Sequence, residues 1–432
     1  IVAGNGNTIT IAPTTDGQTI GLGAGAGTFS ISNAEIAQLL TTGSLVLGST
    51  TGGMAAGRIE VSGADFSAIA GLTGLSLLTG ADVVDPDNAG PHLIAGALTT
   101  VTLDAATGVG ADAANRLDTS VSSLAARTTT SGGVFIDDVD GLVISNGAGF
   151  NGVSTTNDGD VAILSGSGTL LIASAISAGA GLVDLDGATL DVDADVSGGD
   201  IDIDATGTLD VATGAQVIAG GAGTTLTIDA AGITLHEGSA GNETVVNSGD
   251  GTVTLTATGA TDISLTSFAI GAADGVLTLN ASGGDIIVLT GTTATDAEIV
   301  ASGDISLTAI EIGEDNAGGM TTGGLDVSGD AGGDRLLTVD VVRDDPTSPQ
   351  TVLIDVSTDQ FSDIEIVSGD DDANMAITLA LGDVITVDDG PAGALDLTNI
   401  DLSNTGATLD FSLTEDESVL RAIGGTVVLG AD

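Results

Sequence analysis

The residues of this sequence best suited to chemistry are aspartates that alternate with aliphatic residues between positions 184 and 204. The alternation predicts that their carboxylates lie on the outer faces of three neighbouring strands. Aspartate is a poor strand former. A bound Ca²⁺ would account for these residues, because it takes several oxygen ligands in flexible geometry. The pattern favours a solvated anionic face and leaves calcium as the alternative, with these candidate ligands: Asp184, Asp186, Asp191, Asp193, Asp195, Asp200, Asp202 and Asp204.

Two further features of the sequence concern calcium binding. The nonapeptide calcium repeat of parallel β-rolls is absent, because the run from Gly220 to Gly223 continues with Thr224 and Thr225, and Thr225 stands where that repeat needs aspartate. A second acidic run, Asp370 to Asp372, lies between two strand-like segments and is predicted to be a loop that either binds an ion or is solvated. Calcium is the one cofactor that these patterns suggest.

The sequence offers few residues for catalysis. The imidazoles are those of His92 and His236, and His236 follows a strand-like segment, where a surface or corner position is expected. Lyases of acidic sugars need basic residues, whereas this chain has six Arg and no Lys, and it has no Trp or Tyr to stack on a sugar. Carboxylate pairs arise by chance among 60 acidic residues, so spacing identifies no glycosidase pair. We predict that the chain is not an enzyme, and a polysaccharide-acting β-helix enzyme is the least favoured alternative.

A short phrase that recurs between residues 201 and 309 predicts the fold. It reads aliphatic, polar, aliphatic, polar, Ala, and its copies begin at residues 201, 226, 253, 277 and 305, which are 25, 27, 24 and 28 positions apart. A period of this length is typical of solenoids. The alternation places the aliphatic residues and Ala inside and the polar residues outside each strand. We predict an all-β chain that forms a parallel β-helix with rungs of about 25 residues.

Other segments of the sequence suggest insertions and a boundary. Residues 34–40 are predicted to form a short helix capped by Asn33. Leu117, Val121 and Leu124 are spaced as in a second helical insertion on the side of the solenoid. After residue 330 the repeat is less regular. We expect a β-helix over residues 1–330 and a β-rich region over residues 331–432 that either continues the solenoid or is β-sandwich-like.

Three segments, 115–128, 132–136 and 141–144, carry a family resemblance. Together they resemble the large repetitive bacterial exoproteins of the filamentous-haemagglutinin type, and the segment from Ile31 to Gly48 is similar to another phrase common in those proteins. The resemblance covers roughly residues 20–310. It implies a right-handed parallel β-helix that is exported to the bacterial cell surface and serves in adhesion, fibres or matrix. It carries over no catalytic residue, and the Asn-Pro-Asn-Gly-type motifs of the family's secretion module are not present.

The composition limits the partners of the chain. A net charge of −54 disfavours nucleic acid and anionic membranes, which need clustered Lys and Arg, and favours divalent cations; a merely soluble or halophilic surface is the open alternative. No apolar run reaches the roughly 20 residues that insert across a membrane. Uncapped ends of a β-helix can add further subunits. We therefore expect an extracellular structural protein that self-associates into a cell-surface filament, matrix or surface layer, with the rigid stalk of a larger adhesin as the alternative.

Overall fold

The computed structural model describes most of the first half of the chain and mainly strands in the second half. The described residues are 1–2, 6–87, 89–96, 99–236, 244–247, 251–265, 270–272, 276–288, 297–301, 304–310, 312–314, 325–328, 336–341, 351–355, 363–368, 374–378, 384–388 and 408–411. The chain divides into two units, Ile1–Gly207 and Thr208–Asp432. The boundary that the sequence predicts at residue 330 lies outside the described residues and stays a prediction.

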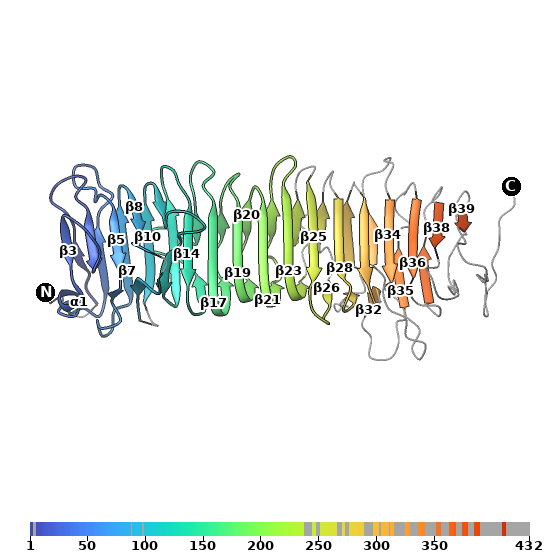
Figure 1. The fold of residues 1–432 in the computed structure, drawn as a ribbon, viewed down its shortest axis with the longest axis horizontal. Coiled ribbons are helices and arrows are strands. Elements are labelled where there is room, and N and C mark those ends of the chain that lie inside the picture. Colours follow the sequence, from blue (N-terminus) through green and yellow to red (C-terminus); the bar gives the residue numbers. More distant parts are fainter. Residues whose placement is uncertain are drawn as a thin grey trace. The chain divides into compact units, whose positions relative to one another are not determined.

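The regular secondary structure of unit 1 is almost entirely strands, which follow one another in chain order (Figure 1). Its single described helix is α1 (Asn33–Ile36). The strands are β1 (Ile9–Ile11), β2 (Ile20–Gly23), β3 (Phe29–Ile31), β4 (Ser44–Gly48), β5 (Ile59–Ser62), β6 (Ala64–Asp65), β7 (Gly74–Thr79), β8 (Asp82–Val84), β9 (Leu93–Ile94), β10 (Thr100–Ala105), β11 (Gly108–Val109), β12 (Leu117–Ser120), β13 (Ser123–Thr128), β14 (Val134–Asp138), β15 (Leu142–Ile144), β16 (Val153–Ser154), β17 (Val161–Ile172), β18 (Ile176–Ser177), β19 (Val183–Val192), β20 (Val196–Gly198) and the start of β21 (Ile201–Val211).

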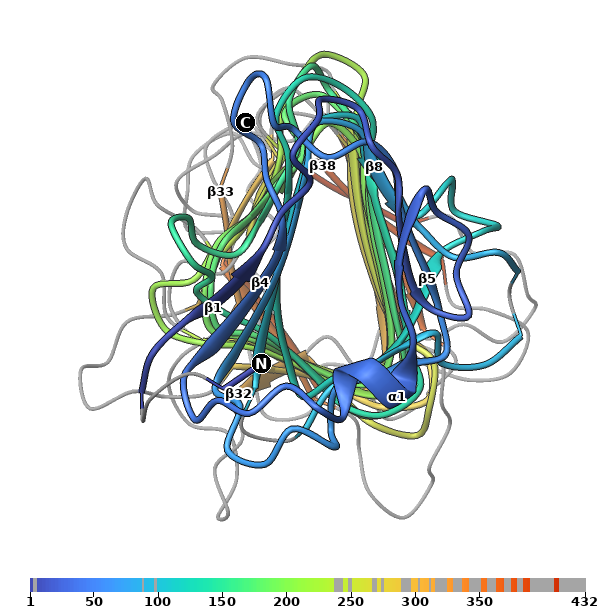
Figure 2. The same ribbon diagram turned by 90° about the vertical axis from the view of Figure 1, so that its left-hand side faces the viewer.

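Most strands of unit 1 pair in parallel with a strand about one rung further along the chain, whereas β3 pairs with the preceding strand β2. One series runs β1, β4, β7, β10 and β13, and a second runs β2, β5, β8, β11 and β14. A third series runs β6, β9 and β12. Figure 2 shows β1 and β4 on one side of a common interior, β5 and β8 on another, and α1 beside them. Unit 1 is therefore a parallel, solenoid-like array of strands, as the sequence predicts.

Unit 2 is also built from parallel strands. Its strands are β22 (Val217–Ala219), β23 (Thr225–Leu235), β24 (Val245–Asn247), β25 (Thr252–Ala257), β26 (Ile263–Leu265), β27 (Ile270–Ala272), β28 (Val276–Ala281), β29 (Ile286–Val288), β30 (Ala297–Ala301), β31 (Ile305–Ala309), β32 (Ile312–Glu314), β33 (Leu325–Ser328), β34 (Leu336–Val341), β35 (Thr351–Asp355), β36 (Asp363–Ser368), β37 (Asn374–Thr378), β38 (Val384–Asp388) and β39 (Thr408–Phe411). The described pairings of these strands are parallel, for example β23 with β25, β25 with β28 and β28 with β31.

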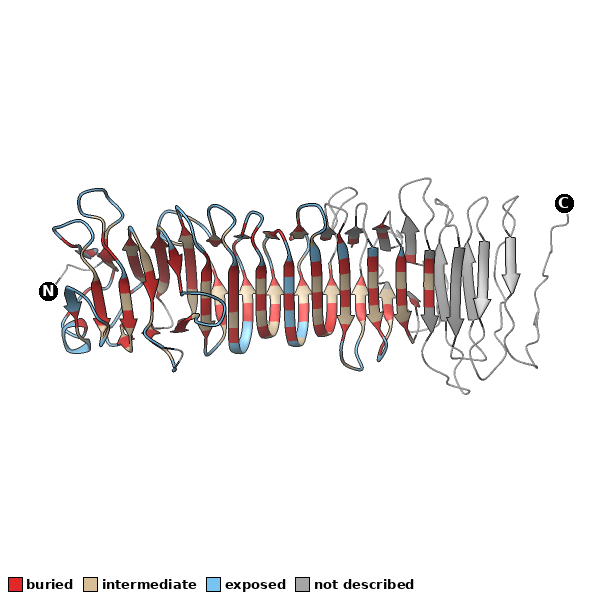
Figure 3. Cartoon of the chain, turned by 45° about the horizontal axis from the view of Figure 1, so that its top comes forward, coloured by how far each residue is buried: buried red, intermediate tan, exposed pale blue. Residues whose placement is uncertain are grey.

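The recurring phrase of the sequence occupies equivalent positions of these paired strands. Its second aliphatic residue stacks in register, with Ile228 opposite Leu255, Leu255 opposite Leu279 and Leu279 opposite Leu307. All four side chains are fully buried. Buried and intermediate residues alternate along the strands, which Figure 3 shows as bands. The predicted inward and outward positions are therefore confirmed for these rungs, and each buried Leu or Ile stabilises the fold by roughly 1.5–3 kcal/mol.

The structure corrects both helix predictions. Helix α1 spans four residues and its N-cap is Ser32, whose backbone N–H and Oγ both donate to Glu35 Oε2. The predicted cap, Asn33, instead donates to the Gly63 carbonyl and accepts from the Asp65 N–H.

The second predicted helix, at residues 110–130, is wrong. Leu117 and Leu124 are fully buried on separate strands, β12 and β13, and Val121 lies at the corner between them. The helical spacing of these three residues arises because a corner separates two inward-facing positions, and it does not reflect one continuous face.

Candidate functional site

A group of polar side chains surrounds the connection from β8 to β9 in unit 1. Asp85 directly follows β8, and His92 directly precedes β9. β9 pairs in parallel with β12, and the backbone N–H of His92 donates to the carbonyl of Asp118 on β12. This pairing places His92 and Asp118 side by side on adjacent strands.

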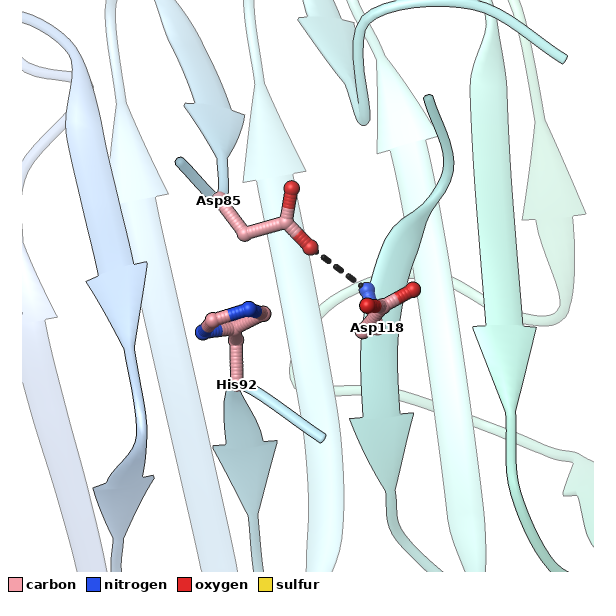
Figure 4. A group of neighbouring side chains, drawn as sticks. All are labelled: Asp85, His92 and Asp118. Atoms are coloured by element: carbon pink, nitrogen blue, oxygen red, sulfur yellow. Dashed lines mark hydrogen bonds between the residues drawn. The ribbon is translucent and has the colours of Figure 1, made fainter. Parts of the chain in front are cut away.

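The three side chains converge. Asp85 Oδ2 accepts a hydrogen bond of 2.8 Å from the backbone N–H of Asp118 (Figure 4). One oxygen of each carboxylate and one ring nitrogen of His92 lie within 4.8 Å of one another. His92 and Asp118 are buried and Asp85 is half-buried. The arrangement brings two carboxylates and one imidazole together in a place with little access for solvent.

The two nitrogens of His92 have different surroundings. Nε2 lies 3.0 Å from Oδ1 of Asp87, an exposed residue of the same connection. Nδ1 is buried and has no hydrogen-bond partner among the described residues. The His92 side chain is only 10% exposed. A buried polar atom without a partner carries a free-energy cost, so Nδ1 is the unusual atom of this group.

Burial changes the titration of both carboxyls. It is the largest cause that raises the pKa of Asp118 to about 6, and the neighbouring carboxylates of Asp85 and Asp137 add to the increase. Burial also raises the pKa of Asp85, against the hydrogen bond from the Asp118 backbone. Negative charge is therefore costly here, which fits a place where the protein concentrates carboxylates that a cation could stabilise.

Sequence reasoning missed this group. Asp85 and Asp118 look like ordinary members of an acidic chain, and His92 lies in no recognisable motif. A signal was nevertheless present. Asp118 follows His92 by 118 − 92 = 26 residues, which is about one rung, and residues one rung apart lie side by side in a solenoid.

The predicted aspartate ladder lies on and around β19, β20 and β21. Asp184, Asp186 and Asp191 are half-buried, and the remaining five are exposed: Asp193, Asp195, Asp200, Asp202 and Asp204. Burial is the largest cause that raises the pKa of Asp184, and Asp186 adds to it. Whether calcium binds to this ladder stays a prediction.

A cation of the chain itself already contacts the ladder. Arg116 Nη2 lies 3.0 Å from Asp184 Oδ2 and 3.2 Å from Asp186 Oδ2. The Arg116 side chain is only 14% exposed. The sequence analysis did not predict this contact, because Arg116 and Asp184 are 68 residues apart.

Two further features that the sequence singles out are His236 and the acidic run from Asp370 to Asp372. His236 Nε2 lies 3.1 Å from Asp210 Oδ2, and both side chains are partly exposed, which is compatible with the surface or corner position that the sequence predicts. The acidic run from Asp370 to Asp372, which the sequence predicts to be a loop, lies outside the described residues.

Comparison with protein-family models, with curated proteins and with solved structures finds no match for this chain. The resemblance to exoproteins of the filamentous-haemagglutinin type therefore rests on the sequence phrases alone. Among the described residues, no helix has the length and apolar character needed to cross a membrane.

Proposed function

We propose that this chain is an extracellular structural protein of a bacterial cell surface, which assembles into a filament, matrix or surface layer. The observation that carries the proposal is the parallel stacking of strands within each unit, with aliphatic residues inside and polar residues outside. Such an array is a rigid scaffold with long polar faces. In this proposal the strands wind as a right-handed parallel β-helix with rungs of about 25 residues.

Self-association is supported by an edge of unit 1. β1 pairs with β4 on one side, and no strand pairs with its other edge among the described residues. Thr10 at the centre of β1 is exposed. An edge strand with free backbone groups can pair with another chain, so the proposed assembly adds a strand of a second copy there.

The alternative is the rigid stalk of a larger adhesin. In that case further residues of the same polypeptide cover the edge of β1, and the isolated chain does not assemble. The phrases that resemble exoproteins of the filamentous-haemagglutinin type are compatible with either role, because both are roles of surface-exposed β-helices.

Divalent cations are the proposed partners of the acidic surface. With a net charge of −54, neighbouring copies repel one another unless cations screen or bridge them. The exposed carboxylates of the ladder, such as those of Asp200, Asp202 and Asp204, are the proposed place for Ca²⁺ to bridge. The proposal needs no catalytic residue.

Electron microscopy and sedimentation of the purified chain, with Ca²⁺ and with a chelator, test this function. We expect assemblies that grow with protein concentration and come apart on chelation. Thr10→Lys places a charge on the free edge and should reduce assembly. The control is Thr227→Lys on β23, a half-buried outward position of a strand that pairs with β25. Assembly that both variants retain argues against the edge of β1, and single particles at every concentration favour the stalk.

A further inference from the structure

We propose that Asp85, His92 and Asp118 form a binding site for one divalent transition-metal ion, represented by Zn²⁺. This inference goes beyond the proposed function, because a scaffold needs no such site and the calcium ladder lies on other residues. It rests on the convergence of the three side chains and on the buried, unpartnered nitrogen of His92.

The donor atoms favour a transition metal over calcium. Ca²⁺ and Mg²⁺ are bound in proteins by oxygen ligands, whereas imidazole together with carboxylate suits Zn²⁺ and its neighbours in the first transition row. Two carboxylates and one imidazole supply three ligands and leave one or more positions for water. The same three residues would hold calcium poorly, because His92 contributes no oxygen.

Asp87 orients the imidazole for this role. Metal-bound histidines almost always donate the other ring N–H to a carboxylate, a carbonyl or water, which fixes the tautomer. Asp87 Oδ1 lies 3.0 Å from Nε2 of His92. A proton on Nε2 leaves the lone pair of Nδ1 free, and Nδ1 is the nitrogen without a partner among the described residues. Asp87 is thus a positioning residue, and Nδ1 is the proposed ligand atom.

The carboxyl groups around the site also favour the binding of a cation. Asp85, Asp87 and Asp118 place three carboxyl groups around one imidazole. Among the described residues, the ion pairs formed by arginine involve Asp82, Asp104, Asp184 and Asp186, and none involves Asp85 or Asp118. A divalent ion would therefore supply the positive charge that no arginine of the described part of the chain provides.

The spacing of the ligand atoms is close to that of a metal site. Bonds from Zn²⁺ to nitrogen and oxygen are about 2.0–2.2 Å, so its ligand atoms lie at most about 4 Å apart. The present limit of 4.8 Å needs a contraction of under about 1 Å, which rotation of the half-buried Asp85 side chain can supply. The bound ion would fasten the connection between β8 and β9 to β12.

The chain offers a matched control for testing this site. Its two imidazoles are those of His92 and His236, it has no Cys, and among the described residues the partly exposed imidazole of His236 forms an ion pair with Asp210 alone. We would strip the full chain with a chelator and titrate Zn²⁺ in competition with a chromogenic chelator. The titration contains excess Ca²⁺, which occupies any cation site built from oxygen ligands alone and so leaves Zn²⁺ to the proposed site. We expect one Zn²⁺ per chain at high affinity. His92→Gln should weaken it at least about 100-fold, Asp87→Asn about 10-fold, and His236→Gln not at all.

A second measurement keeps the test decisive if His92→Gln fails to fold. Nitrogen NMR of the unaltered chain resolves two imidazoles, and the His236→Gln variant assigns them. Added Zn²⁺ should shift the Nδ1 resonance of His92 and leave that of His236 in place. The inference is overturned if the His92→Gln variant folds and binds Zn²⁺ as tightly as the unaltered chain. It is equally overturned if Zn²⁺ leaves the His92 resonances unchanged, or if excess Ca²⁺ abolishes binding.

Discussion

The burial of ionisable side chains differs between residues 82–138 of unit 1 and residues 225–309 of unit 2. In the later region the described inward positions of the repeat hold Ile, Leu, Val and Ala, stacked in register from strand to strand. In the earlier region several charged or ionisable side chains are buried as well: His92, Asp104, Asp118 and Asp138. Two regions of the same general architecture therefore differ in whether they bury ionisable side chains.

The later region, with its aliphatic rungs, serves as scaffold, whereas the earlier region, with its buried ionisable side chains, contains the candidate site. Aliphatic rungs need only the right volume, so they can repeat with little change. Buried polar groups need specific partners and are costly without them. Asp138 has such partners, because Thr119 Oγ1 and the Val121 N–H both donate to it. His92 lacks a partner for Nδ1. Departures from a regular pattern are where functional groups are expected, and the earlier region contains them.

The largest expected effect comes from breaking an aliphatic rung. Leu279 is fully buried between Leu255 and Leu307, so Leu279→Ala removes contacts with two neighbouring rungs and leaves a cavity. We expect a loss of about 2–5 kcal/mol in the free energy of unfolding, measured by urea denaturation. Thr278→Ala on the outward face of the same strand should change it by less than about 0.5 kcal/mol. Equal effects of the two variants would contradict the inward and outward assignment.

The next effect comes from removing the arginine of the ladder. Arg116→Gln leaves the half-buried carboxylates of Asp184 and Asp186 without their cation, and we expect a loss of about 1–3 kcal/mol in unfolding experiments at low salt. If Ca²⁺ binds at the ladder, millimolar Ca²⁺ should stabilise this variant more than the unaltered chain. The triple variant with Asp184→Asn and Asp186→Asn as well should recover stability without calcium. An Arg116→Gln variant as stable as the unaltered chain would show that the contact is dispensable.

A smaller effect concerns pH. Burial is the largest cause that raises the pKa of Asp138, which is fully buried, against three hydrogen bonds that lower it. The folded state therefore binds the proton more tightly than the unfolded state, whose aspartates titrate at about 3.9. This contribution to stability is complete below the unfolded pKa and is lost as pH rises through the folded pKa.

Asp138→Asn isolates that contribution. The amide cannot ionise, and its oxygen still accepts a hydrogen bond, so we expect a stability change of about 1 kcal/mol at neutral pH. The decline in stability from about pH 4 upward should be shallower than in the unaltered chain. Urea midpoints at a series of pH values measure this. As a control, Thr278→Ala changes an outward residue of β28 that carries no titratable group, and it should leave the pH profile as it is. An identical profile for the Asp138→Asn variant would exclude Asp138 as a source of the slope.

Local patterns predicted the rungs, and contacts between rungs were harder to predict. The repeat from 201 to 309 was visible because its alternation is contained within five residues of sequence. Contacts that cross rungs depend on the length of each corner, which varies. Arg116 contacts Asp184 although β14 and β17 stand between β12 and β19 in the pairing order. The spacing of Leu117 and Leu124 predicted a helix because the sequence does not mark the corner at Val121.

The smallest expected effect compares two arginine pairs of unit 1. Arg58 binds Asp82 at 2.7 Å but is 55% exposed. Arg127 binds Asp104 through Nε and Nη2 at 2.9 and 2.8 Å, Asp104 is only 10% exposed, and the guanidinium lies 4.5 Å from the centre of the Phe150 ring. Arg58→Gln should cost less than about 1 kcal/mol. Arg127→Gln should cost more, because it also loses the cation–π contact and leaves the Asp104 carboxylate buried without its partner.

The salt dependence of unfolding distinguishes the two arginine pairs. We would measure the unfolding of both variants at about 0.1 M and about 1 M NaCl. The higher salt concentration should remove most of the stability loss caused by Arg58→Gln, because ions screen an exposed pair within a few ångströms at high salt. The Arg127→Gln effect should largely persist, since packing against Phe150 and burial of Asp104 do not depend on screening. If both effects vanish at high salt, buried charge in the earlier region is no better protected than surface charge, and the contrast between the two regions would rest on hydrophobic stacking alone.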